Sequence, residues 1–226
     1  MSNILTPYQA VLFDLDGTLV DSNELHVESW DRAFRHFGKS FSRAALRKQI
    51  GKGSDKYLPE FLSDEEIKRF GKALDQFRSD LFQRQYLPRV RPFPQVRALF
   101  QTLRRAGKSA VLATSGKKIE AKHYTQLLEI DDLIAGLTTA DDADESKPAP
   151  DIFEAALSRL DGIPAARAIV VGDTPYDMEA AGKLDLAAIG FLCGGTTDGK
   201  ALEAAGALRL FRDPADLLSA LRPAAG

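Results

Sequence analysis

The stretch VLFDLDGTLVDS, from Val11 to Ser22, decides the fold of this chain. Its apolar residues lead up to Asp14, a second acid, Asp16, follows two residues later, and Gly17 then turns the chain away. Continuous apolarity without alternation is typical of a strand that is covered on both faces. The sequence therefore predicts a buried strand that ends in two acids, although two carboxylates so close together should repel each other.

Short apolar runs of this kind recur along the chain, each four or five residues long and bounded by Gly, Asp or Thr. They are Ala10–Phe13, Ser109–Ala113, Leu133–Leu137, Ala168–Val171, Leu186–Ile189 and Leu208–Phe211. Amphipathic helical patterns lie between them, as in Val96–Arg105 and Ile152–Leu160. A regular alternation of strands and helices predicts a parallel sheet with right-handed crossovers, and hence a Rossmann-like α/β core.

The segment from Asp21 to Arg89 breaks this alternation, because it contains helical patterns and no strand pattern. The helical patterns cover Glu24–Phe37, Ser42–Ile50, Ser54–Phe61 and Asp64–Gln85, and Pro88, Pro92 and Pro94 end the run. The simplest interpretation is an α-helical domain inserted after the first strand. We expect the core to comprise residues 1–20 and 89–226, and the inserted domain to comprise residues 21–88.

Composition excludes several classes of partner. The chain has 226 residues, 44% of them hydrophobic, and its 30 basic and 32 acidic side chains leave a net charge of −2. No strong field draws such a protein to nucleic acid or to an anionic membrane. Neither a secretory signal nor an apolar segment of about 20 residues is visible, and the single cysteine, Cys193, cannot form an internal disulfide. We expect a cytoplasmic protein, a monomer or weak homodimer, without a nucleic-acid or membrane partner.

Three further segments put polar or charged side chains where a strand ends or a helix begins. They are Thr114-Ser115-Gly116, Ser146-Lys147-Pro148-Ala149-Pro150-Asp151 and Gly172-Asp173-Thr174-Pro175-Tyr176-Asp177. Each has an ordinary structural interpretation on its own, as a turn, a surface lysine or an acidic helix cap. Together with Asp14 and Asp16, however, they belong to one edge of the predicted sheet, where open α/β sheets bind ligands.

A divalent cation resolves the repulsion between the acids. Asp14, Asp16 and Asp173 offer the oxygen ligands that Mg²⁺ prefers. The ion would offset the carboxylates that hold it and leave room for an anionic phosphoryl group. Lys147 and Thr114 would then neutralise and position the remaining phosphate oxygens.

The segments FDLDGTLVDS, ATSG, SKPAPD and GDTPYD, in this order and spacing, resemble the four signature motifs of the haloacid-dehalogenase (HAD) superfamily. The resemblance covers essentially the whole chain and is greatest to the branch of phosphoglycolate phosphatase and β-phosphoglucomutase. It implies a HAD-like core with an α-helical cap inserted after the first strand. True dehalogenases lack the second carboxylate of the pair, so the presence of Asp16 argues against that activity.

The resemblance implies a role for each matching residue at the catalytic centre. Asp14 would be the nucleophile that forms an aspartyl-phosphate. Asp16 would protonate the leaving alcohol and then activate water. Thr114 and Ser115 would bind the phosphoryl group, and Lys147 would bridge Asp14 and the phosphate.

The resemblance also implies a metal site and a perturbed acid. Asp14, Asp173 and the backbone carbonyl of Asp16 would bind Mg²⁺, with Asp177 as an outer or alternate contact. Because Asp16 must be protonated to act as an acid, we expect its pKa to lie above the ordinary value of about 3.9. Neighbouring acids and a closed, dry site favour that direction.

Two parts of the inserted domain are candidates for substrate binding. Lys52 and Lys56, in the stretch Gln49–Lys56, could meet an anionic leaving group, although a solvated turn between helices has the same pattern. His26 resembles a position that contacts the nucleophile region and helps the cap to close, although a lone His is often structural. Both remain open at this stage.

These observations favour a Mg²⁺-dependent phosphatase that hydrolyses a small organic phosphomonoester, a phosphorylated metabolite, through an aspartyl-phosphate. A β-phosphoglucomutase-like phosphotransferase is an alternative, but the stretch KGSDKY lacks the arginine that grips a second phosphate in the mutase. A receiver-like domain that is only phosphorylated on Asp is a remote alternative. In receiver domains the acid pair precedes the phosphorylated Asp by a whole strand–helix–strand, and no large insertion is present.

Overall fold

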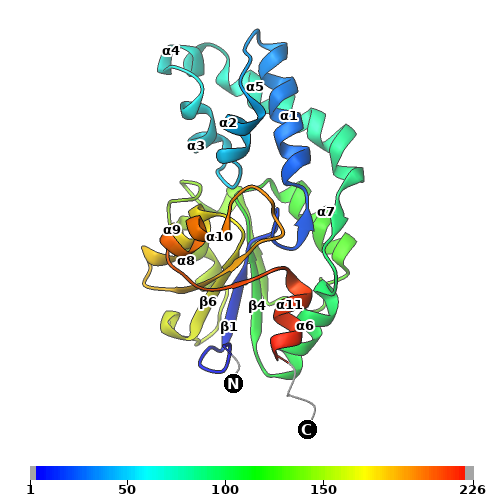
Figure 1. Cartoon of the computed structure of the whole chain (residues 1–226), viewed down its shortest axis with the longest axis vertical. Helices are drawn as coiled ribbons and strands as arrows, with labels where there is room; N and C mark the ends of the chain where they lie inside the picture. The colour runs from blue at the N-terminus through cyan, green and yellow to red at the C-terminus, as the bar shows by residue number, and fades with distance from the viewer. Residues whose placement is uncertain (1–3, 222–226) are drawn as a thin grey trace.

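The computed structural model describes residues 4–221 and contains a six-stranded parallel sheet with helices on both faces (Figure 1). The strand order is β5-β4-β1-β6-β7-β8. The bounds are β1 Ala10–Phe13, β4 Ser109–Ala113, β5 Gly136–Thr138, β6 Ala168–Gly172, β7 Ala187–Phe191 and β8 Ala207–Phe211. The predicted α/β class and parallel sheet are therefore confirmed.

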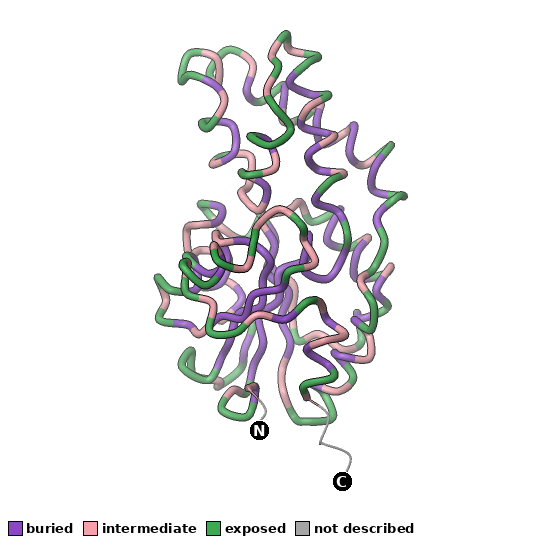
Figure 2. Tube along the Cα trace, in the orientation of Figure 1, coloured by how far each residue is buried: buried purple, intermediate pink, exposed green. Residues whose placement is uncertain are grey.

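Strand β1 lies in the middle of the sheet, and its side chains alternate between two hydrophobic layers. Leu12 pairs with Val111 of β4 and with Val170 of β6. Val11 and Phe13 pack into one layer, with helices α6 (Val96–Arg105), α7 (Lys118–Leu128) and α11 (Pro214–Leu221). Ala10 and Leu12 pack into the other, with α8 (Asp151–Leu157), α9 (Pro175–Gly182) and α10 (Gly199–Ala204). Figure 2 shows the central strands buried between these layers.

One predicted strand is displaced. The run Leu133–Leu137 was expected to be extended, but only Gly136–Thr138 pairs with β4. Leu133 instead donates its backbone N–H to Ile130 in a turn at the end of α7. An apolar run alone does not distinguish a short strand from the buried turn that leads into it.

An all-helical segment is inserted between β2 (Val20–Asp21) and β3 (Arg91–Pro92), which pair antiparallel at its base. Its α-helices are α1 Asn23–His36, α2 Arg43–Lys48, α3 Ser54–Tyr57, α4 Asp64–Glu66 and α5 Lys72–Leu81. Shorter 3₁₀ and π-helical segments are Leu58–Glu60, Leu87–Arg89, Ile67–Gly71 and Phe82–Tyr86. Sequence patterns did not predict β2 and β3, because each has only two residues and β3 contains a proline.

The insert has a hydrophobic cluster of its own. Trp30 stacks on Tyr57 at 4.4 Å between ring centroids, and Phe34 and Leu74 are fully buried beside them. Helix α4 begins at the predicted point, where Ser63 forms a capping box with Glu66. In Figure 1 the insert stands over the end of the sheet at which β1 terminates. Within residues 4–221, no helix combines the length and the apolar character needed to cross a membrane.

Candidate active site

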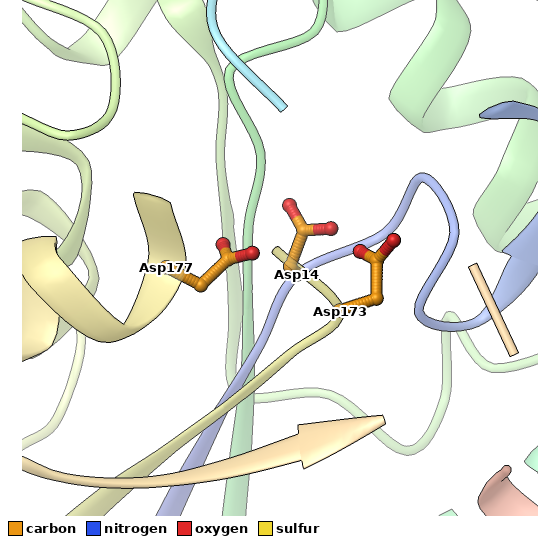
Figure 3. A group of neighbouring side chains, drawn as sticks. All are labelled: Asp14, Asp173 and Asp177. Atoms are coloured by element: carbon orange, nitrogen blue, oxygen red, sulfur yellow. The ribbon is translucent and has the colours of Figure 1, made fainter. Parts of the chain in front are cut away.

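Three buried carboxylates gather at the end of the sheet that faces the insert. Asp14 follows β1, Asp173 follows β6, and Asp177 lies in the first turn of α9 (Figure 3). Their nearest oxygens all lie within 4.8 Å of one another. The Thr174 side chain and backbone N–H both donate to Asp177 Oδ2, so a capping box orients this carboxylate.

Lys147 joins two of these carboxylates. Its Nζ lies 2.6 Å from Asp14 Oδ1 and 2.7 Å from Asp177 Oδ1, and it also donates to the Ala113 carbonyl at 3.1 Å. Burial lowers the pKa of the Lys147 ammonium, but the two carboxylates outweigh burial and hold the pKa above its ordinary value. The sequence-predicted lysine therefore lies against the sequence-predicted nucleophile as a buried cation.

Asp173 is held in a cradle that sequence reasoning did not identify. Thr18 Oγ1 donates to Asp173 Oδ1 at 3.0 Å, and Asn23 Nδ2 donates to Asp173 Oδ2 at 2.8 Å. A Cβ on Gly17 or Gly194 would lie 2.2 Å or 1.8 Å from Asp173 Oδ2, so only glycine fits at either position. Gly17 also has a φ of 75°, which favours glycine.

The charges in this cluster favour a bound cation. Burial raises the pKa of Asp14 to about 7, and the neighbouring Asp177 and Asp16 add to the rise, while Lys147 opposes it. Burial also raises the pKa of Asp173 well above its ordinary value, with Asp14 adding to the effect. Three carboxylates face one ammonium, so their full ionisation would leave excess negative charge that a cation would offset, and every donor atom is an oxygen. Both properties fit a hard divalent ion such as Mg²⁺.

Asp16 lies apart from the three-carboxylate cluster. Its Oδ1 accepts a hydrogen bond from Ser22 Oγ at 2.6 Å and lies 2.8 Å from His26 Nε2. Burial raises the pKa of Asp16, but His26 and the hydrogen bonds outweigh it and lower the pKa to about 2. The predicted rise in this pKa is therefore wrong for this structure, because the contacts with His26 and Ser22 outweigh the effect of burial.

His26 reaches Asp16 from helix α1 of the insert. Its ring stacks on Phe82 at 4.1 Å, and its Nδ1 faces the guanidinium of Arg78. Arg78 comes from α5, packs against Trp30 and Phe82, and faces Glu120 of α7 in the core. Polar contacts thus run from Asp16 of the core to His26 and Arg78 of the insert, and from Arg78 back to the core at Glu120. The sequence did not identify Arg78 and Glu120 as site residues, because each is one charged residue among several in a helical pattern.

The remaining predicted residues surround the same space. Thr114 is buried after β4, and its Oγ1 accepts a hydrogen bond from the Gly116 N–H at 2.9 Å. Ser115 Oγ accepts from the Lys147 N–H at 3.4 Å. Lys52 lines the space, but its Nζ donates to Gln49 and to Glu60 Oε1 at 2.8 Å.

Lys56 is likewise paired with an acid. Its Nζ pairs with Glu145 of the core. Glu60 and Glu145 therefore already neutralise Lys52 and Lys56. To bind an anionic leaving group, each lysine would have to leave its acidic partner.

A cavity of about 260 Å³ separates the insert from the core. Asp14, Asp16 and Thr114 line its floor side, and Trp30 and Gly51 belong to the insert. Direct hydrogen bonds close the insert over the cavity: Gly53 N–H donates to Ser146 Oγ at 2.9 Å, and the Ser146 N–H donates to Asp55 Oδ2 at 3.1 Å. The space is slightly smaller than a typical site for a drug-sized ligand, which fits a small metabolite.

Comparisons with known proteins agree with this geometry. The model of the family described as haloacid dehalogenase-like hydrolase matches residues 11–191. The chain is 28% identical over 217 residues to the phosphorylated carbohydrates phosphatase of Thermotoga maritima, covering 95% of this chain and 98% of that protein. It is 29% identical over 204 residues to the validoxylamine A 7'-phosphate phosphatase of Streptomyces hygroscopicus subsp. limoneus, covering 89% and 92%. The crystal structure of a hydrolase from Pseudomonas syringae superposes with a TM-score of 0.81 and 32% identity, covering 94% and 97%.

Proposed function

The chain belongs to the haloacid dehalogenase-like hydrolase family, and on that premise we propose that it is a Mg²⁺-dependent phosphatase of small organic phosphomonoesters. The observation that carries the proposal is the contact of Lys147 Nζ with Asp14 Oδ1 at 2.6 Å, inside a cluster of three buried carboxylates. Phosphoryl transfer asks a protein chiefly for in-line placement and charge stabilisation. A carboxylate fixed beside a buried cation supplies both.

The proposed reaction has two displacements at phosphorus. In the first, an Asp14 carboxylate oxygen forms a bond to phosphorus, the bond from phosphorus to the alcohol oxygen breaks, and Asp16 gives that oxygen a proton. In the second, Asp16 takes a proton from water, the water oxygen attacks phosphorus, and Asp14 leaves as a carboxylate. Lys147, Thr114 and Ser115 bind the phosphoryl oxygens throughout.

Asp16 is ionised in the arrangement described above, which is the form required for the second displacement. An anionic phosphoryl group arriving beside it would raise its pKa and allow it to carry the proton needed in the first. His26 holds the Asp16 carboxylate in position for both. In this scheme Ser22 has the same positioning role from the other side.

Asp14 and Asp173, with the backbone carbonyl of Asp16, would hold Mg²⁺, and Asp177 would act through Lys147 and as an outer contact. The ion, when bound, would neutralise charge on the transferring phosphoryl group. We further propose that residues 21–88 act as the cap, which excludes water during the reaction and selects the substrate. The cross-contacts of Gly53, Asp55 and Ser146 support this role.

The test compares Asp14→Asn with Asp161→Asn, an exposed control acid, on p-nitrophenyl phosphate with Mg²⁺ and with EDTA. We expect Asp14→Asn and EDTA each to abolish turnover, while the control keeps wild-type activity. Circular dichroism should show that the Asp14→Asn variant remains folded. Undiminished turnover by Asp14→Asn would overturn the proposal.

A further inference from the structure

Every basic side chain among the described residues that line the cavity already faces an acid. The nitrogen–oxygen distances are 2.8 Å for His26–Asp16, 2.8 Å for Lys52–Glu60, 3.2 Å for Lys117–Asp75 and 3.9 Å for Arg78–Glu120. Asp55 and Asp144 add further negative charge to the lining, whereas Glu145 pairs with Lys56. A leaving group with its own anionic charge would therefore meet no free cation on this side of the cavity.

The Arg78–Glu120 pair differs from the other three because its two members do not hydrogen-bond to each other, although a second guanidinium nitrogen of Arg78 contacts His26 Nδ1. The two residues are 9% and 1% exposed, yet Arg78 Nε and Glu120 Oε1 form no hydrogen bond with any described residue. Their closest nitrogen–oxygen distance, 3.9 Å, is too long for a hydrogen bond. A buried donor or acceptor without a partner costs about 1–3 kcal/mol, so the structure keeps these two side chains in the cavity lining at a cost in stability.

Aromatic rings hold the Arg78 side chain in place, and Glu120 faces it from the core. Arg78 packs against the rings of Trp30 and Phe82, with its guanidinium carbon 5.0 Å from each ring centroid. Glu120 comes from the opposite wall, and its Oε2 lies 3.7 Å from the point that a Cβ on Gly116 would occupy. The Asp16 Oδ2 atom lies 3.5 Å from the same point, so the pair adjoins the proposed general acid.

A hydroxyl group in the cavity matches this pair, because both side chains line the cavity and one hydroxyl can accept from the Arg78 guanidinium and donate to the Glu120 carboxylate. Resting on the proposed function, we infer that Arg78 and Glu120 form a hydroxyl-binding subsite for the leaving group, and that the substrate is the phosphate ester of a neutral polyol such as a sugar. Phosphorylated carboxylic acids and bisphosphates would place a second anion beside Glu120. Arg78 belongs to the insert and Glu120 to the core, so the subsite is complete only when the insert is closed.

The test measures kcat/KM with Mg²⁺ for glucose 6-phosphate, sorbitol 6-phosphate, 2-phosphoglycolate and p-nitrophenyl phosphate. For the wild type we expect one or both polyol esters to exceed 2-phosphoglycolate by about tenfold or more, since a hydrogen bond to a charged group contributes about 1.5–3 kcal/mol. Glu120→Ala should reduce the ratio of polyol ester to p-nitrophenyl phosphate by a similar factor. Glu203→Gln, an exposed acid on α10, is the control and should leave every ratio unchanged.

Glu120→Gln gives a second, directional readout that does not depend on Glu120→Ala folding. This nearly isosteric change removes the negative charge and frees Arg78 to pair with an anion. We therefore expect the ratio of 2-phosphoglycolate to polyol ester to rise by about tenfold. A purely structural role for Glu120 would lower all substrates together and leave that ratio fixed.

The outcomes separate this inference from the proposed function. A wild type that hydrolyses p-nitrophenyl phosphate but prefers 2-phosphoglycolate, or a Glu120→Gln variant with unchanged selectivity, overturns the hydroxyl subsite alone. A wild type that hydrolyses none of the four esters with Mg²⁺ overturns the proposed function.

Discussion

Replacing Lys147 by Met tests the electrostatics of the proposed active site, because it keeps most of the length of the side chain and removes its charge. The ammonium is the buried cation between Asp14 and Asp177, with both contacts under 3 Å. Removing one partner of a buried ion pair typically costs about 3–5 kcal/mol, since the remaining charge has neither water nor a partner. For a chain of this size that cost corresponds to a fall in Tm of about 6–20 °C.

A bound divalent ion should recover part of this loss. Mg²⁺ held by the carboxylate cluster would neutralise the charge that Lys147 no longer offsets, and a ligand that binds only the folded state also stabilises it by mass action. We therefore expect the Lys147→Met variant to lose more stability in EDTA than in Mg²⁺. Hydrolysis of p-nitrophenyl phosphate should be lost in both conditions.

The assay is thermal and urea unfolding, followed by circular dichroism, with Mg²⁺ or EDTA. Lys122→Met, an exposed lysine on α7, is the matched control and should lie within about 0.5 kcal/mol of the wild type. A Lys147→Met variant within about 1 kcal/mol of the wild type in EDTA would refute the reasoning, since the buried carboxylates would then not depend on this cation.

Three further perturbations follow from the same structure. Gly194→Ala puts a Cβ 1.8 Å from Asp173 Oδ2, so we expect calorimetry to show weaker Mg²⁺ binding, whereas Gly182→Ala, with no atom within 4 Å of its Cβ, should bind Mg²⁺ normally. Equal Mg²⁺ affinity in the two variants would contradict the cradle around Asp173. Burial raises the pKa of Glu120 above 4.5, so the folded state holds more protons than the unfolded chain just above that pH, and wild-type stability falls as pH rises. Glu120→Gln removes that loss, so urea unfolding from pH 4.5 upward should show the variant gaining stability relative to the wild type. Stability profiles that stay parallel over this pH range would contradict a raised pKa for Glu120. Phe34→Ala opens the insert's own hydrophobic cluster and should cost about 3–5 kcal/mol by urea unfolding, while a loss under about 1 kcal/mol would argue that the cluster does not stabilise the insert.

The arrangement of Asp14, Thr114 and Asp173 was predictable from the sequence for a simple physical reason. Strands of one parallel sheet end at the same edge, so polar residues that follow buried apolar runs have to meet there. The alternation of strands and helices fixed which runs those were, without any knowledge of side-chain packing. The helical nature of the segment after β1 was predictable in the same way, from periodicity and the prolines that end it.

Contacts between the insert and the core were not predictable by this reasoning. Asn23 reaches Asp173, and Arg78 reaches Glu120, because of how helices α1 and α5 dock on the core, which periodicity within a helix does not determine. The predicted direction of the Asp16 pKa shift was wrong for a related reason. Burial was foreseeable, but the hydrogen bond with His26 depends on the angle at which α1 leaves the sheet.

The central claim is that Asp14 accepts the phosphoryl group, and a rapid-quench experiment on Asp16→Asn tests it most directly. The p-nitrophenolate group leaves without a general acid, so the first displacement can proceed in this variant, whereas the second lacks its base and the intermediate should accumulate. We expect a stoichiometric burst of nitrophenolate and, by mass spectrometry, phosphate on the peptide that contains Asp14. The absence of a burst, or phosphate on a different residue, would contradict the account.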